Sequence, residues 1–174
     1  EMKNIPSMVD NFSILKSSTS AFDETWEPVW GEVKKIRNQY NELEITLEQG
    51  SPKRTVIIRF RLYDDGLGFR YEFPNQKNLS YFTIAEEITQ FNLGKDYTAF
   101  WIRGDYDTNE YNYTTSLLSE VSHQIDAATE EISAQTPTKE ISVQTPLMLK
   151  GNGVYINIHE AALKDYPAML LELD

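Results

Sequence analysis

The chain has 174 residues, of which 40% are hydrophobic and 12% aromatic, a composition typical of one folded domain over residues 1–174. Its 27 acidic residues outnumber 16 basic ones and give a formal net charge of -11, which argues against nucleic acid as a partner because affinity for phosphates comes mainly from Lys and Arg. No apolar run approaches the roughly 18 residues of a membrane span. The absence of cysteine excludes disulfides and thiolate chemistry.

Alternating apolar residues predict strands along most of the chain. The clearest are Thr55–Tyr63 and Leu67–Phe73, which are separated by a turn at Asp64-Asp65-Gly66 and together predict a hairpin. We expect Gly66 to supply the positive φ of a tight turn. The other predicted strands are Leu43–Glu48, Tyr81–Phe91, Tyr97–Arg103, Ser142–Leu149, Val154–His159 and Met169–Leu173.

One stretch has helical rather than strand spacing. Apolar residues recur at helical intervals between Thr115 and Ser133, and Pro137 ends the pattern. The segment Glu131–Pro137 returns nearly unchanged as Glu140–Pro146, which we interpret as a loop with a local duplication. Many strands with short turns and at most one helix predict an antiparallel β-sandwich.

Aromatic residues are the first candidates for function. Trp26 and Trp30 flank Pro28, which disfavours a helix there. They could form a platform for sugar rings, or they could pack at a sandwich edge, and the residue types leave both interpretations open. Only two histidines exist, and neither His123 nor His159 has the sequence neighbours of a hydrolase triad or a metal pair.

Glu160 poses a sharper question. Ile156 and Ile158 define the apolar face of a strand, and Glu160 falls on the same face two residues later. A carboxylate there is costly unless it is paired or bound to a cation. Either the strand has ended and Glu160 is solvated, or it meets a metal ion or an arginine at the end of the sheet.

Four segments resemble the N-terminal domain of glycoside hydrolase family 97, closest to the α-glucosidases of Bacteroides starch utilisation. The likeness runs in order along essentially the whole chain, and it is weakest between Ser122 and Gln144. The segments are Phe22–Glu32, Ile36–Leu43, Ile58–Pro74 and Tyr155–Leu163, the last with Asp165-Tyr166.

This resemblance implies a mainly β, galactose-mutarotase-like supersandwich, truncated at both ends, that packs against a (β/α)8 catalytic barrel followed by a small C-terminal β-domain. It implies an exported, periplasmic bacterial enzyme that cleaves α-glucosidic bonds in maltooligosaccharides with calcium in the active site. In the α-glucosidase branch the reaction inverts, with one carboxylic acid and one carboxylate base. Both belong to the barrel, so no catalytic residue is expected in this chain.

The same resemblance assigns site residues. The family's N-domain calcium ligand is a Glu in a His-Glu-Ala-Ala-Leu motif, which matches Glu160. The matched segments make Trp30, Glu32, Asn157 and His159 candidates for the substrate pocket.

Two hypotheses follow for the function. The first is a non-catalytic N-terminal domain that supplies one calcium ligand and a wall of the pocket of an α-glucosidase, or of an α-galactosidase of the same family. The second is a free-standing carbohydrate-binding sandwich that uses Trp26, Trp30 or Trp101. Because a truncated sandwich exposes unpaired strand edges, we also expect self-association of the fragment.

Overall fold

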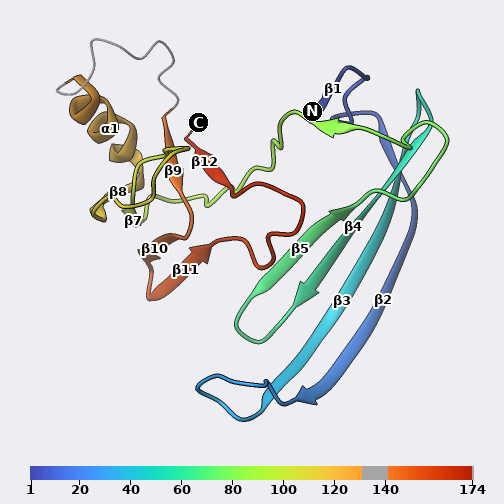
Figure 1. Cartoon of the computed structure of the whole chain (residues 1–174), viewed down its shortest axis with the longest axis horizontal. Helices are drawn as coiled ribbons and strands as arrows, with labels where there is room; N and C mark the ends of the chain where they lie inside the picture. The colour runs from blue at the N-terminus through green and yellow to red at the C-terminus, as the bar shows by residue number, and fades with distance from the viewer. Residues whose placement is uncertain (131–140, 174) are drawn as a thin grey trace. The chain divides into compact units, whose positions relative to one another are not determined.

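The computed structural model describes residues 1–130 and 141–173, and the chain divides into two compact units, Glu1–Gln90 and Phe91–Asp174 (Figure 1). Both units consist of antiparallel strands, so the predicted fold class, mainly β and antiparallel, is confirmed. That residues 1–174 form a single domain stays a prediction. In the part of the chain that is described, no helix has the length and apolar character needed to cross a membrane.

Unit 1 is dominated by one four-stranded sheet. Its strands are β2 (Phe12–Trp26), β3 (Ile36–Gln49), β4 (Arg54–Leu62) and β5 (Leu67–Glu72), in that spatial order. On one face the register pairs Leu43 with Phe60 and Phe60 with Phe69, so the alternation seen in the sequence becomes an apolar face.

The opposite face of this sheet carries a charged cluster centred on Arg59. Its guanidinium contacts Glu42 at 2.5 Å, Glu44 at 2.7 Å and Glu72 at 2.8 Å. Hydrogen bonds to Glu72 and Glu42 raise the pKa of Arg59 above its ordinary value. The hydrogen bond from Arg59, supported by Arg70, lowers the pKa of Glu72 to about 2 although partial burial opposes this. The carboxylates and arginines therefore stabilise one another across three strands.

Strands β2 and β3 continue beyond the rest of the sheet as a two-stranded ribbon (Figure 1). The last pairing between β3 and β4 joins Asn41 to Leu62, whereas β2 and β3 stay paired to Trp26 and Ile36. Residues 27–35, which we call the tip loop, connect the two strands. Phe22 stacks on Tyr40 in the ribbon, with ring centroids 5.2 Å apart.

A buried arginine attaches the N-terminal residues to this sheet. Arg54, 1% exposed, donates to the backbone oxygens of Pro6 at 2.7 Å and Ser7 at 3.0 Å, and to Gln49 Oε1. Gln49 in turn donates through Nε2 to Ser7 O and Asp10 O. The short strands β1 (Met2–Lys3) and β6 (Thr83–Ile84) pair in the same unit.

The described residues of unit 2 form a second four-stranded sheet, a two-stranded sheet and one α-helix. The first has the order β11-β10-β7-β8 and the second pairs β12 with β9. A 3-10 turn, Leu118–Glu120, leads into α1. The core consists of Ala99, Trp101, Val121, Ile125, Val143, Leu147 and Leu149. The elements are β7 (Thr98–Trp101), β8 (Thr114–Leu117), α1 (Val121–Glu130), β9 (Ser142–Gln144), β10 (Leu147–Gly151), β11 (Val154–Ile158) and β12 (Leu170–Glu172).

The predicted hairpin at 55–73 is confirmed as β4 and β5, but its turn differs from the prediction. Tyr63 N–H donates to Gly66 O at 2.8 Å across a four-residue loop, and Gly66 does not have a positive φ. The left-handed turn residues are instead Asn152 (φ 51°) and Gly153 (φ 78°), which join β10 to β11 as a two-residue hairpin.

Four other sequence expectations need correction. The strand predicted at 81–91 contains only β6, because Tyr81 and Ile88 are exposed and only Thr83–Ile84 has a partner strand. The single strand predicted at 142–149 is two strands, since Thr145 and Pro146 interrupt it and proline lacks an N–H. The helix starts later than predicted, because residues 114–117 pair with β7. The second copy of the near-repeat includes β9 rather than a loop, and the first copy lies outside the described residues.

Candidate functional site

Two strand ladders of unit 2 end on either side of Thr145, one at Gln144 and the other at Leu147. Pairing of Leu147 with Ile158 in β10–β11, continued by two residues, places Glu160 opposite Thr145. Pairing of Leu170 with Gln144 in β12–β9, continued by one, places Met169 opposite Thr145. We call Thr145, Glu160 and Met169 the strand-end junction.

The Glu160 carboxylate is held at this junction by one donor on each oxygen. The Thr145 hydroxyl donates to Glu160 Oε2 at 2.7 Å, and the Met169 N–H donates to Oε1. Partial burial opposes ionisation, but these hydrogen bonds outweigh it and keep the pKa of Glu160 below its ordinary value. Glu160 is therefore an ionised, partly exposed carboxylate with a fixed direction, rather than a freely solvated residue.

The faces of β11 follow the sequence prediction. Ile156 and Ile158 pack against the core of unit 2, and Glu160 lies on their side, partly buried. Asn157 and His159 are exposed, as alternation requires. His159 Nδ1 lies 3.0 Å from the Glu160 backbone oxygen. Three of the five candidate residues thus occupy neighbouring positions.

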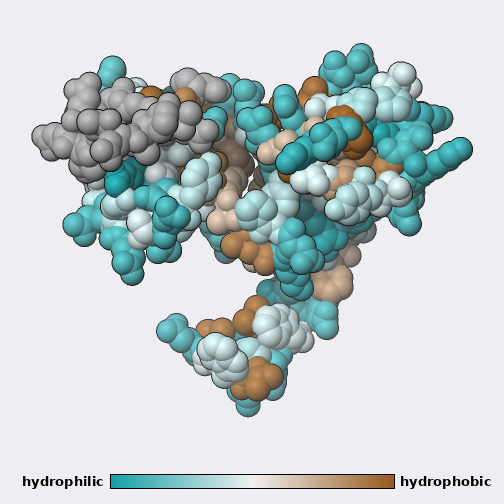
Figure 2. Space-filling model, turned by 45° about the horizontal axis from the view of Figure 1, so that its top comes forward, coloured by the Kyte–Doolittle hydropathy of each residue, from teal (hydrophilic) through white to brown (hydrophobic). Residues whose placement is uncertain are grey.

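The other two candidates, Trp30 and Glu32, belong to the tip loop of unit 1. Trp30 is 88% exposed, and Val29 and Val33 beside it are exposed as well. Figure 2 shows hydrophobic residues beside polar ones at this projecting end. Glu32 is exposed and follows Gly31, which has a φ of 139°. The tip loop therefore exposes an aromatic ring to solvent. It contains no helix, as the presence of Pro28 predicts.

The three tryptophans have different environments. Trp26 is 47% exposed at the end of β2, so it is accessible like Trp30. Trp101 is 4% exposed, belongs to the core of unit 2 and donates through Nε1 to Ser116 Oγ at 3.1 Å. Its proposed role as a sugar platform is wrong, because the alternation of β7 turns its ring inward.

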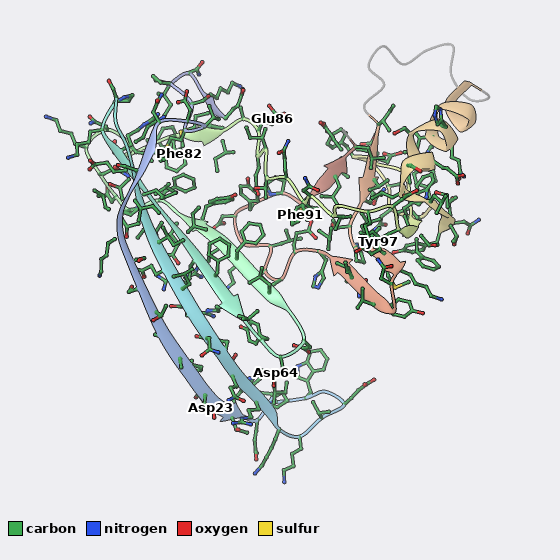
Figure 3. All side chains as sticks on the ribbon, turned by 180° about the vertical axis from the view of Figure 1, so that it is seen from behind. Asp23, Asp64, Phe82, Glu86, Phe91 and Tyr97 are labelled. Atoms are coloured by element: carbon green, nitrogen blue, oxygen red, sulfur yellow. The ribbon has the colours of Figure 1, made fainter. Side chains whose placement is uncertain are left out.

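A hollow lies where β4 leaves the ribbon (Figure 3). Asp23 from β2 and Asp64 from the β4–β5 turn are labelled there, and Asp23 is paired with Arg37 through two hydrogen bonds of 2.8 and 2.6 Å. The side chains of Phe22 and Tyr40 add aromatic surface. No sequence motif indicated this hollow. Its lining residues are Ala21, Phe22, Asp23, Gln39, Tyr40, Asn41, Leu62 and Asp64.

Comparison with known proteins decides the family. The family model described as glycosyl-hydrolase 97 N-terminal matches residues 1–174. The chain belongs to glycoside hydrolase family 97, as its N-terminal domain.

Relatives of this family 97 domain are longer proteins. A retaining alpha-galactosidase of Bacteroides thetaiotaomicron is 25% identical over 93% of the chain and 23% of its own length. Solved structures of a family 97 enzyme from Pseudoalteromonas sp. strain K8, one with acarbose and a Glu→Gln variant with panose, are each 33% identical. Each match has a TM-score of 0.83 and covers 100% of this chain and 24% of that one. The chain thus spans about a quarter of these relatives.

The family 97 domain can contribute one ligand to a cation. The Glu160 carboxylate accepts hydrogen bonds from Thr145, from Met169 and from its own backbone N–H, and a carboxylate has about four acceptor positions, so a position remains for a hard cation such as calcium. Among the residues at 1–130 and 141–173, no group of three or more His, Asp or Glu side chains is arranged to hold a metal. One carboxylate supplies at most two of the six to eight oxygens that calcium takes, so the described residues fit this ion only as a single ligand.

Two features of the family 97 domain were missed by sequence reasoning. Thr145 gave no signal because its partner lies 15 residues away and depends on the register of a ladder. The second is the loop that begins at Asp105, where Tyr111 donates to Asp105 Oδ2 at 2.5 Å and its ring lies 4.1 Å from the Arg103 guanidinium carbon. The hydrogen bonds from Tyr111 and the Asp107 N–H lower the pKa of Asp105.

Proposed function

We propose that this chain is the non-catalytic N-terminal domain of a calcium-dependent α-glucosidase that hydrolyses α-glucosidic bonds in maltooligosaccharides, with inversion at the anomeric carbon. The observation that carries the proposal is the Glu160 carboxylate, ionised, partly exposed and held by two donors at the end of β11. Family membership supplies the class of reaction.

The ligands of the solved relatives support glucose rather than galactose as the sugar. Panose is a trisaccharide of α-linked glucose, and acarbose is built from α-linked, glucose-like units. These structures share 33% identity with the chain, against 25% for the curated α-galactosidase. The ligands and the higher identity of these relatives therefore support an α-glucoside as the substrate.

The residues of this chain have distinct roles in the proposal. Glu160 supplies a negatively charged oxygen to calcium, and the bound cation would supply concentrated positive charge that orients oxygen ligands. Asn157 and His159, exposed beside it, provide hydrogen-bonding groups for sugar hydroxyls. Trp30 provides an aromatic face for stacking and Glu32 an acceptor.

The proposal extends to location and association. We place the parent enzyme in the periplasm, where maltooligosaccharides from outside the cell arrive. The described part of unit 1 leaves β2 and β5 as the edges of the four-stranded sheet, so the isolated chain is expected to self-associate by strand addition. Small-angle scattering over a concentration series tests this, and a monomer throughout would contradict it.

The test of function uses the full-length enzyme. We expect hydrolysis of an aryl α-glucoside and of panose, dependence of the rate on added calcium, and a lower calcium affinity in Glu160→Gln than in the wild type. Asn157→Ala is the matched control on the same strand and should change the calcium requirement less. Proton NMR of the first product gives the anomer, and a β-product from an α-substrate is the expected inverting outcome. An unchanged calcium requirement in Glu160→Gln refutes the ligand role.

A second candidate is supported by the curated relative. That protein is a retaining alpha-galactosidase, so the same domain in an α-galactosidase is the alternative. Faster turnover of an aryl α-galactoside than of the α-glucoside, with an α-product, would favour it. The role assigned to Glu160 is the same in both cases, so the calcium titration and the substrate comparison are independent.

A further inference from the structure

We propose that Thr145 is the positioning residue that orients the Glu160 carboxylate toward its cation. This inference rests on the proposed function of Glu160 as a calcium ligand. It adds a residue outside the matched His-Glu-Ala-Ala-Leu segment, because Thr145 lies 15 positions before Glu160 in the sequence.

The hydroxyl proton of Thr145 has one best acceptor. Thr145 Oγ1 lies 2.7 Å from Glu160 Oε2 and 3.3 Å from the Met169 backbone oxygen. A hydroxyl carries a single proton, and an ionised carboxylate is the stronger acceptor at the shorter distance. The hydrogen bond therefore runs from Thr145 to Glu160.

Two donors on two oxygens fix the plane of the carboxylate. With Met169 N–H on Oε1 and Thr145 on Oε2, rotation about the last side-chain bond of Glu160 breaks both hydrogen bonds. The remaining acceptor positions then have a defined direction. Without the hydroxyl, Oε2 loses its Thr145 donor, and the plane of the carboxylate is fixed less firmly.

The position of Thr145 is itself set by the buried residues before it. Val143 is 0% exposed, and the Gln144 N–H donates to Ile102 O at 3.0 Å. Gln144 Nε2 also donates to the backbone oxygens of Arg103 at 3.0 Å and Thr108 at 2.8 Å. Thr145 follows directly after this hydrogen-bonded end of β9, whereas Glu160 lies two residues beyond the end of β11.

Groups that orient metal ligands typically change metal affinity by about 10- to 100-fold when they are removed. Because Met169 remains as a second donor, we expect about a tenfold loss of calcium affinity for Thr145→Val in the full-length enzyme. Thr145→Ser keeps the hydroxyl and should bind calcium nearly as the wild type does. Thr115→Val is the matched control, since Thr115 is exposed on β8 and far from the junction in the register.

The measurement is calorimetric titration of the calcium-depleted, full-length enzyme with calcium alone, with circular dichroism to verify folding. If Thr145→Val does not fold, Thr145→Ala removes the same donor without a branched side chain. Weaker binding in Thr145→Val, recovered in Thr145→Ser and absent in Thr115→Val, supports the inference. Wild-type affinity in Thr145→Val, while Glu160→Gln loses affinity, overturns the inference and keeps the proposed function. Wild-type affinity in Glu160→Gln overturns both.

Discussion

The two units stabilise antiparallel strands by different means. Among the residues at 1–130 and 141–173, eight of the ten buried hydrophobic residues belong to unit 2, where seven of them form one core, and only Val56 and Leu79 belong to unit 1. Unit 1 buries the charged Arg54 with Gln49 and spreads ion pairs over one face of its sheet, whereas the polar residues buried in unit 2 are the uncharged Ser116, Ser142 and Gln144. Unit 2 therefore depends on hydrophobic burial, and unit 1 on pairing of strands and polar groups.

This difference predicts which substitutions destabilise each unit most. Removing a methyl group from a closed core leaves a cavity, so single apolar substitutions should damage unit 2 most. Removing a donor from a buried polar group leaves acceptors without partners, so polar substitutions should damage unit 1 most. Four measurements test this comparison, beginning with the largest expected effect.

The largest effect is expected for Leu149→Ala in unit 2. Leu149 is 0% exposed, so the substitution should reduce the free energy of unfolding by about 2–5 kcal/mol. Hydrogen exchange followed by mass spectrometry on peptides from β7 and β10 reports this loss locally. The matched control Leu67→Ala, at a side chain 61% exposed, should cost less than about 1 kcal/mol. Equal costs would refute the contrast between units.

The next effect is expected for Arg54→Met in unit 1. Pro6 O and Gln49 Oε1 would lose their Arg54 donors, and Ser7 O would keep only the donor from Gln49. We expect the free energy of unfolding to fall by about 2–3 kcal/mol, with faster hydrogen exchange in residues 2–10. Lys53→Met is the control, because its side chain is 71% exposed and makes a single ion pair. Unchanged exchange in Arg54→Met would mean that β1 is held by other contacts.

A smaller effect is expected in the pH dependence of the stability of unit 1. The pKa of Glu72 is lowered to about 2 in the folded state, so its ion pairs stabilise the fold above the unfolded pKa of about 4.5. Their contribution is lost as the pH falls from about 4.5 through about 2. After allowing for solvent screening, we expect this loss to lower the free energy of unfolding by about 1 kcal/mol. The thermal midpoint of Glu72→Gln should therefore fall less over this range than that of wild type or of exposed Glu110→Gln.

The smallest effect on stability is expected for Trp30→Ala. Because Trp30 is 88% exposed, the free energy of unfolding should change by no more than about 0.5 kcal/mol. Trp101→Ala should cost about 3–5 kcal/mol in the same measurement, since Trp101 is in the core. A raised KM for maltotetraose in full-length Trp30→Ala, with an unchanged thermal midpoint, would assign Trp30 to substrate binding.

How far the fold could be predicted depended on whether a strand has an apolar face. Thr55–Tyr63 alternates between apolar and charged residues, and β4 formed as predicted. The 15-residue strand β2 was missed, because its centre reads Ser17-Ser18-Thr19-Ser20 and almost all of it is exposed. Its hydrogen bonds to β3 join residues far apart in sequence, and hydrophobic periodicity detects burial rather than pairing.

For the candidate site, too, the sequence predicted the faces of a strand but not the partners that it meets. Alternation from Ile156 correctly put Glu160 on the inner face and Asn157 on the outer face. Sequence could not show that Thr145 and Met169 would meet there, because their positions follow from two ladder registers and the interruption at Pro146. The resemblance supplied Glu160 as a ligand candidate, and geometry supplied its partners.

The ribbon formed by β2 and β3 also bears on how this domain can diverge. Five residue pairs, from Phe22–Tyr40 to Trp26–Ile36, extend roughly 17 Å past the last residue paired with β4. A two-stranded ribbon of this kind adds little to the stability of the sheet behind it. Insertions or exchanges in the tip loop are therefore expected to leave the sheet intact, so the length and chemistry of the loop around Trp30 can change without a change in the scaffold.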